Sequence, residues 1–394
     1  MSSKRTRALL LVASAVALLT AAVLCGQQDI LPGAPLAGLT SRELELFRLG
    51  RSDFLEVESA TDGLGPVFNG TSCAQCHNIP AIGGTGTIVE TRAGYRDEAG
   101  RFHAPPGGTL MHLFSVPPHN CQVSVYEDAN VIGKRISIPL FGAGLIEAIP
   151  DETLLALQDP SDTNGDGIRG RAAIVDDPAT GQKRVGRFGW KAQQATLLAF
   201  AADAYINEMG ISNDIFPKEE LGNVAKERAS HCLPSDTPED SRNPGTGLRG
   251  IDNFQNFIRF LAPPARGPID NAALRGEHVF ADIGCPSCHV PVLQTGPSPN
   301  PLFDRKPVAL YSDLLLHDIG TGDGIEQADA KGEEIRTPAL WGLRFRRPLL
   351  HDGTAPTIES AIERHAREAS LVIERFKMLP PDLRKDLVGF LKSL

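Results

Sequence analysis

The sequence contains few aromatic residues and little sulfur outside cysteine. Aromatic residues make up 6% of its 394 residues, and beyond Met1 the methionines are Met111, Met209 and Met378. Thioether groups are therefore scarce wherever the chain has to supply a metal ligand. The chain also lacks a basic stripe with interleaved aromatic residues, and its formal net charge is −9. This balance excludes nucleic acid as an expected partner.

Long hydrophobic runs are missing beyond residue 24. The one such run, residues 8–24, follows the basic residues Lys4, Arg5 and Arg7. This order is typical of a secretory signal, and the run is near the lower length for a membrane span. We therefore expect residues 1–27 to be a signal peptide or an N-terminal anchor, with lipidation of Cys25 as a third fate. The expected location is the periplasm, with membrane contact only through an uncleaved N-terminal segment.

The seven cysteines divide into groups with different expected roles. Four of them lie in two Cys-x-x-Cys-His motifs at residues 73–77 and 285–289, and Cys25 falls in the predicted signal. Cys121 and Cys232 remain. They form either one disulfide, which an exported protein permits, or two separate thiols.

The two Cys-x-x-Cys-His motifs carry the chemistry of the chain, because this pattern is the attachment signature of c-type haem. Two thiols three positions apart lie on one helical turn and reach the two vinyl groups of one porphyrin edge. The adjacent histidine then coordinates iron. We expect two covalent c-type haems, attached through Cys73, Cys76, Cys285 and Cys288, with His77 and His289 as proximal iron ligands. The alternative is one zinc ion shared by both cysteine pairs, although Cys73 and Cys285 are 212 residues apart.

The chain contains a diverged internal repeat around these motifs. Each unit places a Gly and a Phe before its cysteine pair, as Gly65 and Phe68 in the first and Gly276 and Phe280 in the second. Each unit also closes with an amphipathic helix, at residues 254–261 and 383–391, beside a Pro-Pro pair. We therefore expect two cytochrome c-like haem domains in a mainly α fold, at residues 28–264 and 268–394.

The first predicted domain is longer than a haem module needs. Residues from about 85 to 230 read as a large insertion with short strands at 122–126 and 135–138 and a helix at 192–209. A capping-box pattern of Thr40 and Glu43 predicts the start of a helix before the first motif.

The second axial ligand of each iron decides the chemistry, since a vacant position binds small ligands and two strong ligands make an electron carrier. His365 is the favoured distal ligand of the second haem, because Thr357 predicts a helix N-cap and Ile358, Ala361 and His365 share one helix face. The alternative is a half-buried histidine bonded to the backbone. The remaining candidates are His103, His112, His119, His231, His278, His317 and His351.

A calcium-like loop is a candidate metal site, and two tryptophans are candidates for electron transfer. Asp162, Asn164 and Asp166 match the first half of an EF-hand loop, but position twelve of that loop is Ala173. Asp159, Asp176 or Asp177 would have to complete the shell, and the alternative is an Asx-rich turn. Trp190 and Trp341 are either electron relays between the haems or packing residues.

The sequence resembles the di-haem oxidoreductases, which are related to bacterial di-haem cytochrome c peroxidases and are also labelled thiol oxidoreductases. The matching stretches are residues 63–69, 144–150, 162–171, 186–191, 311–318, 336–343, 351–353 and 364–365. The resemblance implies two helical haem domains facing each other, electron transfer between the haems, and calcium between the domains. In the peroxidases the position of His365 holds the distal ligand of the C-terminal haem, commonly Met, so His365 implies a bis-His site of lower potential.

By the same resemblance the first haem is the reactive one. The resemblance does not assign its distal ligand, for which His103, His112 and His119 are candidates. Glu90, Glu127 and Gln122 are candidates for a group that assists O–O cleavage. The expected activity is reduction of hydrogen peroxide or a similar oxidant with electrons from an unidentified redox partner. The alternative is an electron carrier with two six-coordinate haems. Thiol oxidation is a weaker third interpretation, because Cys121 and Cys232 share no Cys-x-x-Cys spacing.

Overall fold

The computed structural model describes residues 31–117, 121, 125, 128–217 and 241–394. The predicted N-terminal segment 1–27 lies outside the described residues, as do His119, Gln122, Glu127, His231 and Cys232. No helix in the described ranges is long and apolar enough to span a membrane. Pro32–Leu394 form one unit by their contacts, and the boundaries predicted for the two haem domains within it stay predictions.

The fold of the described residues is mixed, with 32% helix and 15% strand in short sheets, whereas the sequence predicted a mainly α fold. The α-helices are α2 (Ser41–Leu55), α3 (Cys73–Cys76), α4 (Ala143–Glu147), α5 (Asp151–Leu157), α6 (Leu197–Met209), α8 (Gly250–Phe260), α9 (Asn271–Ile283), α10 (Ile358–Glu363), α11 (Ser370–Met378) and α12 (Pro381–Ser393). The 3-10 helices are η1 (Ala60–Asp62), η3 (Cys285–Ser287), η4 (Leu343–Phe345) and η5 (Arg367–Ala369). The strands are β1 (Val67–Phe68), β2 (Val89–Arg96), β3 (Phe102–His103), β4 (Leu110–Met111), β5 (Phe114–Ser115), β6 (Val131–Ile136), β7 (Ile174–Asp177), β8 (Gln182–Val185), β9 (Leu293–Gln294), β10 (Pro307–Val308), β11 (Leu316–His317) and β12 (Ile335–Arg336).

Helices α2 and α8 cross at a glycine. A Cβ on Gly50 would lie 2.1 Å from the carbonyl oxygen of Asn253, so only glycine permits this approach. Phe54, one turn later on α2, packs against Phe257 of α8 with ring centroids 4.8 Å apart. The capping box of Thr40 and Glu43 predicted for the start of α2 is confirmed.

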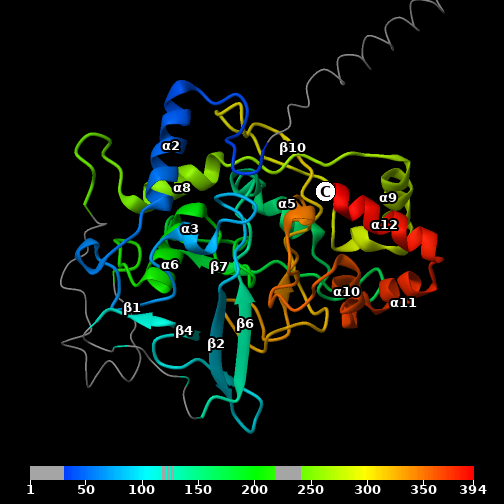
Figure 1. Cartoon of the computed structure of the whole chain (residues 1–394). Coiled ribbons are helices and arrows are strands. Elements are labelled where there is room, and N and C mark those ends of the chain that lie inside the picture. Colours follow the sequence, from blue (N-terminus) through cyan, green and yellow to red (C-terminus); the bar gives the residue numbers. More distant parts are fainter. Residues whose placement is uncertain (1–30, 118–120, 122–124, 126–127, 218–240) are drawn as a thin grey trace, which may run out of the picture. The chain divides into compact units, whose positions relative to one another are not determined.

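Helices α9 and α12 repeat this crossing near the C-terminus. A Cβ on Gly276 would lie 2.0 Å from the carbonyl oxygen of Asp386. Phe280 follows one turn later and packs against Phe390, with ring centroids 5.2 Å apart. Figure 1 shows the α2–α8 pair and the α9–α12 pair on opposite sides of the described unit, and in each pair the two helices lie side by side.

These two crossings correct the alignment of the internal repeat. Gly65 and Phe68 were the predicted counterparts of Gly276 and Phe280, but the structural counterparts are Gly50 and Phe54. The Gly-x-x-x-Phe spacing places both residues on one face of a helix, whereas Val67 and Phe68 form the short strand β1. The predicted closing helices at 254–261 and 383–391 are confirmed as α8 and α12.

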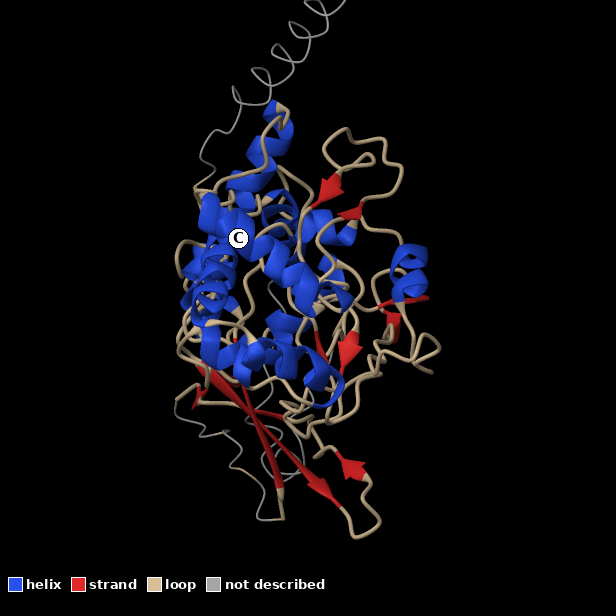
Figure 2. Cartoon of the chain, turned by 90° about the vertical axis from the view of Figure 1, so that its right-hand side faces the viewer, coloured by secondary structure: helices blue, strands red, loops and turns tan. Residues whose placement is uncertain are grey.

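The strands lie mostly between the first motif and α6. Strand β2 pairs antiparallel with β3, β4 and β6, and β7 pairs with β8. In Figure 2 the strands are short apart from one long pair that extends away from the helices. The strand predicted at 135–138 instead runs from Val131 to Ile136, and of the strand predicted at 122–126 only Val125 is described, outside any strand.

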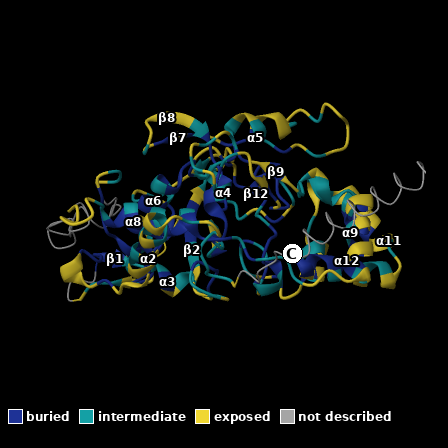
Figure 3. Cartoon of the chain, turned by 90° about the horizontal axis from the view of Figure 1, so that it is seen from above, coloured by how far each residue is buried: buried dark blue, intermediate teal, exposed yellow. Residues whose placement is uncertain are grey.

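Helix α6 begins five residues later than predicted. The helix expected at 192–209 starts at Leu197, because the side chain of Thr196 accepts a hydrogen bond from the Ala199 amide and caps the helix. It ends at Met209 as expected, where Gly210 adopts a left-handed conformation. Figure 3 shows buried residues along α4 and α8, whereas α5 and the β7–β8 hairpin are largely exposed.

Candidate functional site

Each Cys-x-x-Cys-His motif lines a cavity of its own. The first cavity, defined as the one lined by Cys73, Cys76 and His77, holds about 1230 Å³ of empty space, part of it open to solvent. The second cavity, lined by Cys285, Cys288 and His289, holds about 1320 Å³. The two cysteine pairs therefore do not converge on a single site, and the shared-zinc alternative does not fit this geometry.

The two motif histidines have the same local geometry. The Nδ1 atom of His77 donates to the carbonyl of Gly84 at 2.8 Å, and Nδ1 of His289 donates to the carbonyl of Tyr311 at 3.1 Å. Burial lowers the pKa of both rings to about 4. Each ring is thus neutral with its Nε2 lone pair unprotonated, which is the form that binds iron, and a backbone carbonyl fixes the tautomer.

The motif cysteines are poorly suited to thiol redox chemistry. Burial raises the pKa of Cys73, Cys76 and Cys285 to about 12 and raises the pKa of Cys288. The thiolate is the reactive form of cysteine, so these side chains are weak nucleophiles. Two thiols and one neutral imidazole on the wall of a large cavity are the donor set of covalent haem, and both sites fit that group.

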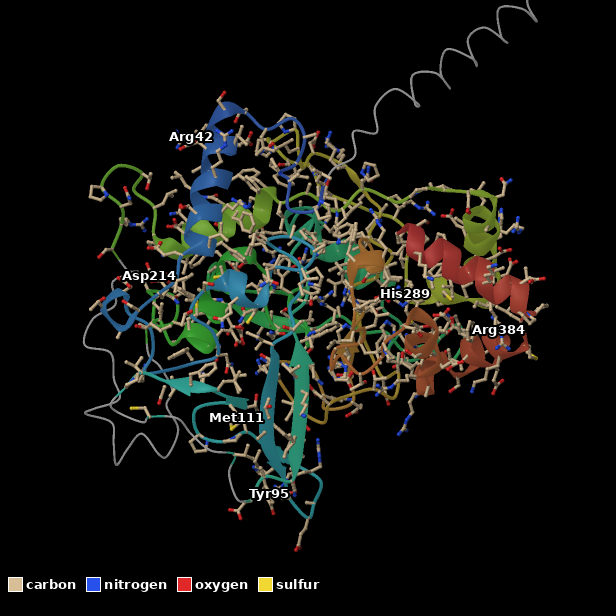
Figure 4. The ribbon with its side chains drawn as sticks, in the orientation of Figure 1. Arg42, Tyr95, Met111, Asp214, His289 and Arg384 are labelled. Carbon is tan, nitrogen blue, oxygen red and sulfur yellow. The ribbon has the colours of Figure 1, made fainter. Side chains whose placement is uncertain are left out.

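Three further histidines line the second cavity, namely His317, His351 and His365. His365 lies just beyond α10, and its Nδ1 donates to the carbonyl of Ala361 at 2.8 Å. This contact leaves Nε2 as the acceptor, as in His289. The N-cap predicted at Thr357 is confirmed, although α10 ends at Glu363 and not at the histidine. Figure 4 shows His289 further inward than Arg384 of α12.

His317 is engaged elsewhere, although the sequence offered it as a candidate ligand. It is 2% exposed, its Nε2 lies 2.8 Å from Asp313, and its Nδ1 lies 2.8 Å from Glu368. Burial alone would lower the pKa of His317, but the neighbouring Asp313 carboxylate outweighs it and raises the pKa well above its usual range. A charged imidazolium between two carboxylates has no lone pair for iron.

The first cavity has a polar wall formed by Glu90, Arg92 and Glu208. Burial raises the pKa of Glu208 to about 8, and the nearby Glu90 carboxylate adds to the shift. Burial would also raise the pKa of Glu90, but Arg92 and Arg135 outweigh it and lower the pKa. Arg92 Nε donates to Glu90 at 2.8 Å. At neutral pH the pair therefore consists of an ionised Glu90 and a protonated Glu208, which is the arrangement of a proton donor.

Asn69 fixes the position of Glu208. Its Nδ2 donates to the Glu208 carboxyl at 2.8 Å, and its backbone amide donates to the Glu208 carbonyl at 2.7 Å. The Asn69 side chain is itself held, because its Oδ1 accepts from the amide of Leu113 at 2.9 Å. Asp203 also lines this cavity, and burial raises its pKa to about 6.

Two of the three histidines predicted as distal ligands of the first haem lie within the described residues, and neither of them lines the first cavity. His103 lies on β3 with Nε2 3.0 Å from Asp97, and His112 Nε2 donates to the carbonyl of Asn207. His119 lies outside the described residues. In the described part of the chain the histidine that lines the first cavity is His77, and Met209 is the thioether in its wall.

Trp190 is the described residue that lines both cavities. It is 5% exposed, and its Nε1 donates to the carbonyl of Ile136 at 2.8 Å. The ring of His351 meets it edge-on with centroids 6.2 Å apart. Trp341 is buried as well but lines neither of these two cavities.

The calcium-like loop forms a network of Asx turns. The side-chain oxygens of Asp162, Asn164 and Asp166 accept hydrogen bonds from the loop's own amides at 2.9–3.0 Å. The acids expected to complete a shell are bonded elsewhere: Asp159 to Thr163, Asp176 to Lys183, and Asp177 to Thr180 and Thr196. A calcium ion at this loop stays a prediction.

Of the two cysteines that were predicted to form a disulfide, only Cys121 lies within the described residues. Cys121 is disulfide-bonded, whereas Cys232 lies outside the described residues. The pairing of Cys121 with Cys232 stays a prediction.

Sequence reasoning identified Glu90 and the motif residues but missed Glu208 and Asn69. Asn69 is the last residue of the matched stretch 63–69 before the first motif, and Glu208 lies at the end of a helix that was predicted. Nothing in the local pattern shows that these residues meet, because 139 positions separate them.

Comparison with known proteins gives two curated relatives. The gamma subunit of hydrazine synthase from Kuenenia stuttgartiensis is 27% identical over 184 residues, which cover 37% of this chain and 48% of that protein. A cytochrome c peroxidase from Escherichia coli is 28% identical over 120 residues, or 30% of this chain and 24% of the peroxidase. The chain thus spans less than half the length of each of these relatives.

Among solved structures, a variant of a di-haem peroxidase from Burkholderia thailandensis is similar at 15% identity and a TM-score of 0.41, covering 88% of this chain and 85% of that one. A protein-family profile matches residues 112–394 and is described as "Di-haem oxidoreductase, putative peroxidase". This match extends over more than half of the sequence. The chain belongs to the di-haem oxidoreductase family.

Proposed function

We propose that the protein is an exported di-haem oxidoreductase that reduces hydrogen peroxide, or a similar oxidant, in the first cavity. Membership of the family implies haem cofactors. In this proposal Cys73, Cys76 and His77 hold one haem, and Cys285, Cys288 and His289 hold the other. Bound haem would supply the redox-active iron at each site. Electrons come from an unidentified periplasmic donor and enter at the second site.

The observation that carries the proposal is the carboxyl pair in the first cavity. Reduction of peroxide to two waters consumes two electrons and two protons, so the site needs a group that holds a proton at neutral pH. Glu208 holds that proton because burial and Glu90 raise its pKa to about 8. Asn69 keeps the carboxyl in place, and the ionised Glu90 beside it favours the protonated form of Glu208.

The second cavity supports a different role. Its wall is largely apolar, and it offers two neutral imidazoles, His289 and His365, with Nδ1 on a backbone carbonyl and Nε2 available. Two strong axial ligands favour electron transfer over binding of an oxidant. His365 is therefore proposed as the distal ligand at this site, and Trp190 as the aromatic connection between the two cavities.

Met209 favours a second candidate function. It is a thioether in the wall of the first cavity, and a thioether ligand there would make both sites six-coordinate. The protein would then be an electron carrier.

The two functions differ in the spin state of the first site. EPR of the oxidised, haem-loaded protein is expected to contain one high-spin and one low-spin ferric signal, together with steady-state consumption of hydrogen peroxide by the protein reduced with a small electron donor. Two low-spin signals that persist on partial reduction, without peroxide turnover, would reject the peroxidase and leave the carrier.

A further inference from the structure

Two buried arginines have guanidinium nitrogens without a partner. In the described part of the chain, three buried side-chain nitrogen or oxygen atoms lack a hydrogen bond: Arg135 Nη2, Asn253 Oδ1 and Arg346 Nε. The two guanidinium nitrogens are divided between the two cavities. Arg135 lines the first cavity and Arg346 lines the second.

Arg346 is a buried cation without a carboxylate. It is 5% exposed, and burial lowers its pKa to about 10. Its guanidinium lies over the ring of Trp190 at 5.9 Å from the centroid. The salt bridges of the described residues do not include Arg346.

Arg336 is likewise a buried cation that forms no salt bridge within the described residues. It is 4% exposed, it lines the second cavity, and its Nε and Nη1 donate to the carbonyls of Gly189 and Thr337 at 2.8 and 3.0 Å. Both arginines also line a smaller cavity of about 480 Å³ that shares Gly189 with the first cavity. Two guanidinium groups thus line the same small cavity. Arg336 donates to carbonyls, and neither arginine pairs with a carboxylate in the described part of the chain.

The nearby carboxylates already have other partners. Asp313 pairs with His317 at 2.8 Å, and Glu368 pairs with the same ring. Asp323 pairs with Arg135 at 2.7 Å and with Lys191 at 3.2 Å. Removing two cations from water without a counter-charge is strongly unfavourable, so the charge on Arg336 and Arg346 requires an anion from outside the chain.

We propose that Arg346, together with Arg336, binds the propionate carboxylates of the haem in the second cavity. The inference rests on the proposed function, because it takes the haem on Cys285 and Cys288 as given. Haem carries two propionates, and a planar guanidinium fork matches a carboxylate with two parallel hydrogen bonds. Arg135 Nη2 offers one donor of the same kind in the first cavity.

The proposal is tested with three variants of the haem-loaded protein. Arg346→Gln removes the charge, Arg346→Lys keeps the charge but not the fork, and Arg344→Gln is the matched control. Arg344 comes from the same segment but donates to the carbonyls of Leu394 and Ala265 and lines neither haem cavity. The haem count of each variant is measured first, by pyridine haemochrome. A wild-type protein without two haems would reject the proposed function and not the arginine site.

Two readouts then report on the propionates. Spectroscopic redox titration of Arg346→Gln is expected to show a more negative midpoint potential for one haem, because loss of a nearby positive charge favours the ferric state. Arg346→Lys should retain most of the wild-type potential, and Arg344→Gln all of it. The propionate bending band in resonance Raman spectra should shift in both Arg346 variants, so the Lys variant suffices if the Gln variant does not fold.

Unchanged potential and band in Arg346 variants that carry both haems would overturn the proposal. A wild-type potential that follows the chloride or phosphate concentration, with an unchanged Raman band in the variants, would overturn it too. That outcome would mean that an anion from solution fills the site.

Discussion

Glu208 and Glu90 share a hydrogen bond on the wall of the first cavity, although both are carboxylic acids. Two carboxyl groups bond in this way when one of them keeps its proton. We predict that Glu208→Gln lowers kcat/KM for hydrogen peroxide by about 100-fold or more, the usual contribution of a general acid. Stopped-flow measurement of peroxide consumption checks this value.

Asp203→Asn is the control for that experiment. Asp203 lines the same cavity but bonds Asn207 and not Glu90. Its substitution is expected to change kcat/KM by much less. Equal losses in both variants would show that the cavity needs its overall negative charge and not a particular proton donor.

The pH dependence of turnover follows from the same carboxyl. Burial and Glu90 raise the pKa of Glu208 to about 8, so the proton is present below this value and lost above it. We predict that kcat/KM of the wild-type protein is steady near pH 7 and falls above about pH 8, whereas the residual activity of Glu208→Gln does not follow this profile. A wild-type profile that stays level beyond about pH 9 would exclude Glu208 as the acid.

Trp190 is predicted to connect the two haem sites. Trp190→Phe is expected to slow electron transfer from the second site to the first several-fold while both haems stay attached. Loss of the indole N–H also leaves the Ile136 carbonyl without its partner, at a cost of about 1–3 kcal/mol in the free energy of unfolding. Rapid-mixing spectroscopy of the half-reduced protein measures the transfer rate. Trp341→Phe is the control, because Trp341 is a buried tryptophan that lines neither haem cavity. An equal transfer rate in the two variants would contradict the prediction.

Gly276 is predicted to be required where α9 crosses α12. A methyl group there would lie 2.0 Å from the Asp386 carbonyl, so Gly276→Ala should lower the free energy of unfolding by about 3 kcal/mol, the upper range for overpacking. Gly389→Ala lies on α12 with nothing within 4 Å of the added methyl group. It should raise stability by about 0.5–1 kcal/mol, because alanine favours a helix over glycine. Thermal unfolding of the haem-loaded variants compares the two, and a destabilised Gly389→Ala would contradict the explanation.

Local signals in the sequence predicted the parts of the fold that depend on near neighbours. The capping residues Thr40 and Thr357 and the closing helices α8 and α12 were found because caps, helical periodicity and prolines act within a few residues. The start of α6 was predicted too early, because residues 192–195, Ala-Gln-Gln-Ala, are good helix formers, whereas Thr196 caps the helix and Leu197 begins it. The repeat was misaligned because Gly65 and Phe68 are nearer to the first motif than Gly50 and Phe54.

The site was predicted only where the motif itself supplies the residues. The Cys-x-x-Cys-His spacing identifies His77 and His289, but the partners of these residues are set by tertiary structure. Glu90 meets Glu208, and His317 meets Glu368, across long stretches of sequence. His317 was a candidate ligand until its two carboxylate partners were known. Such pairings depend on how segments pack, which the order of residues along a helix or strand does not reveal.

The most direct test is the number and position of covalent haems. Intact mass spectrometry and pyridine haemochrome analysis of protein made with a competent cytochrome c maturation system should give two haems per chain. Peptide mapping should place one on Cys73 and Cys76 and the other on Cys285 and Cys288. A colourless product, a mass without two porphyrins, or haem bound to other residues would contradict the account.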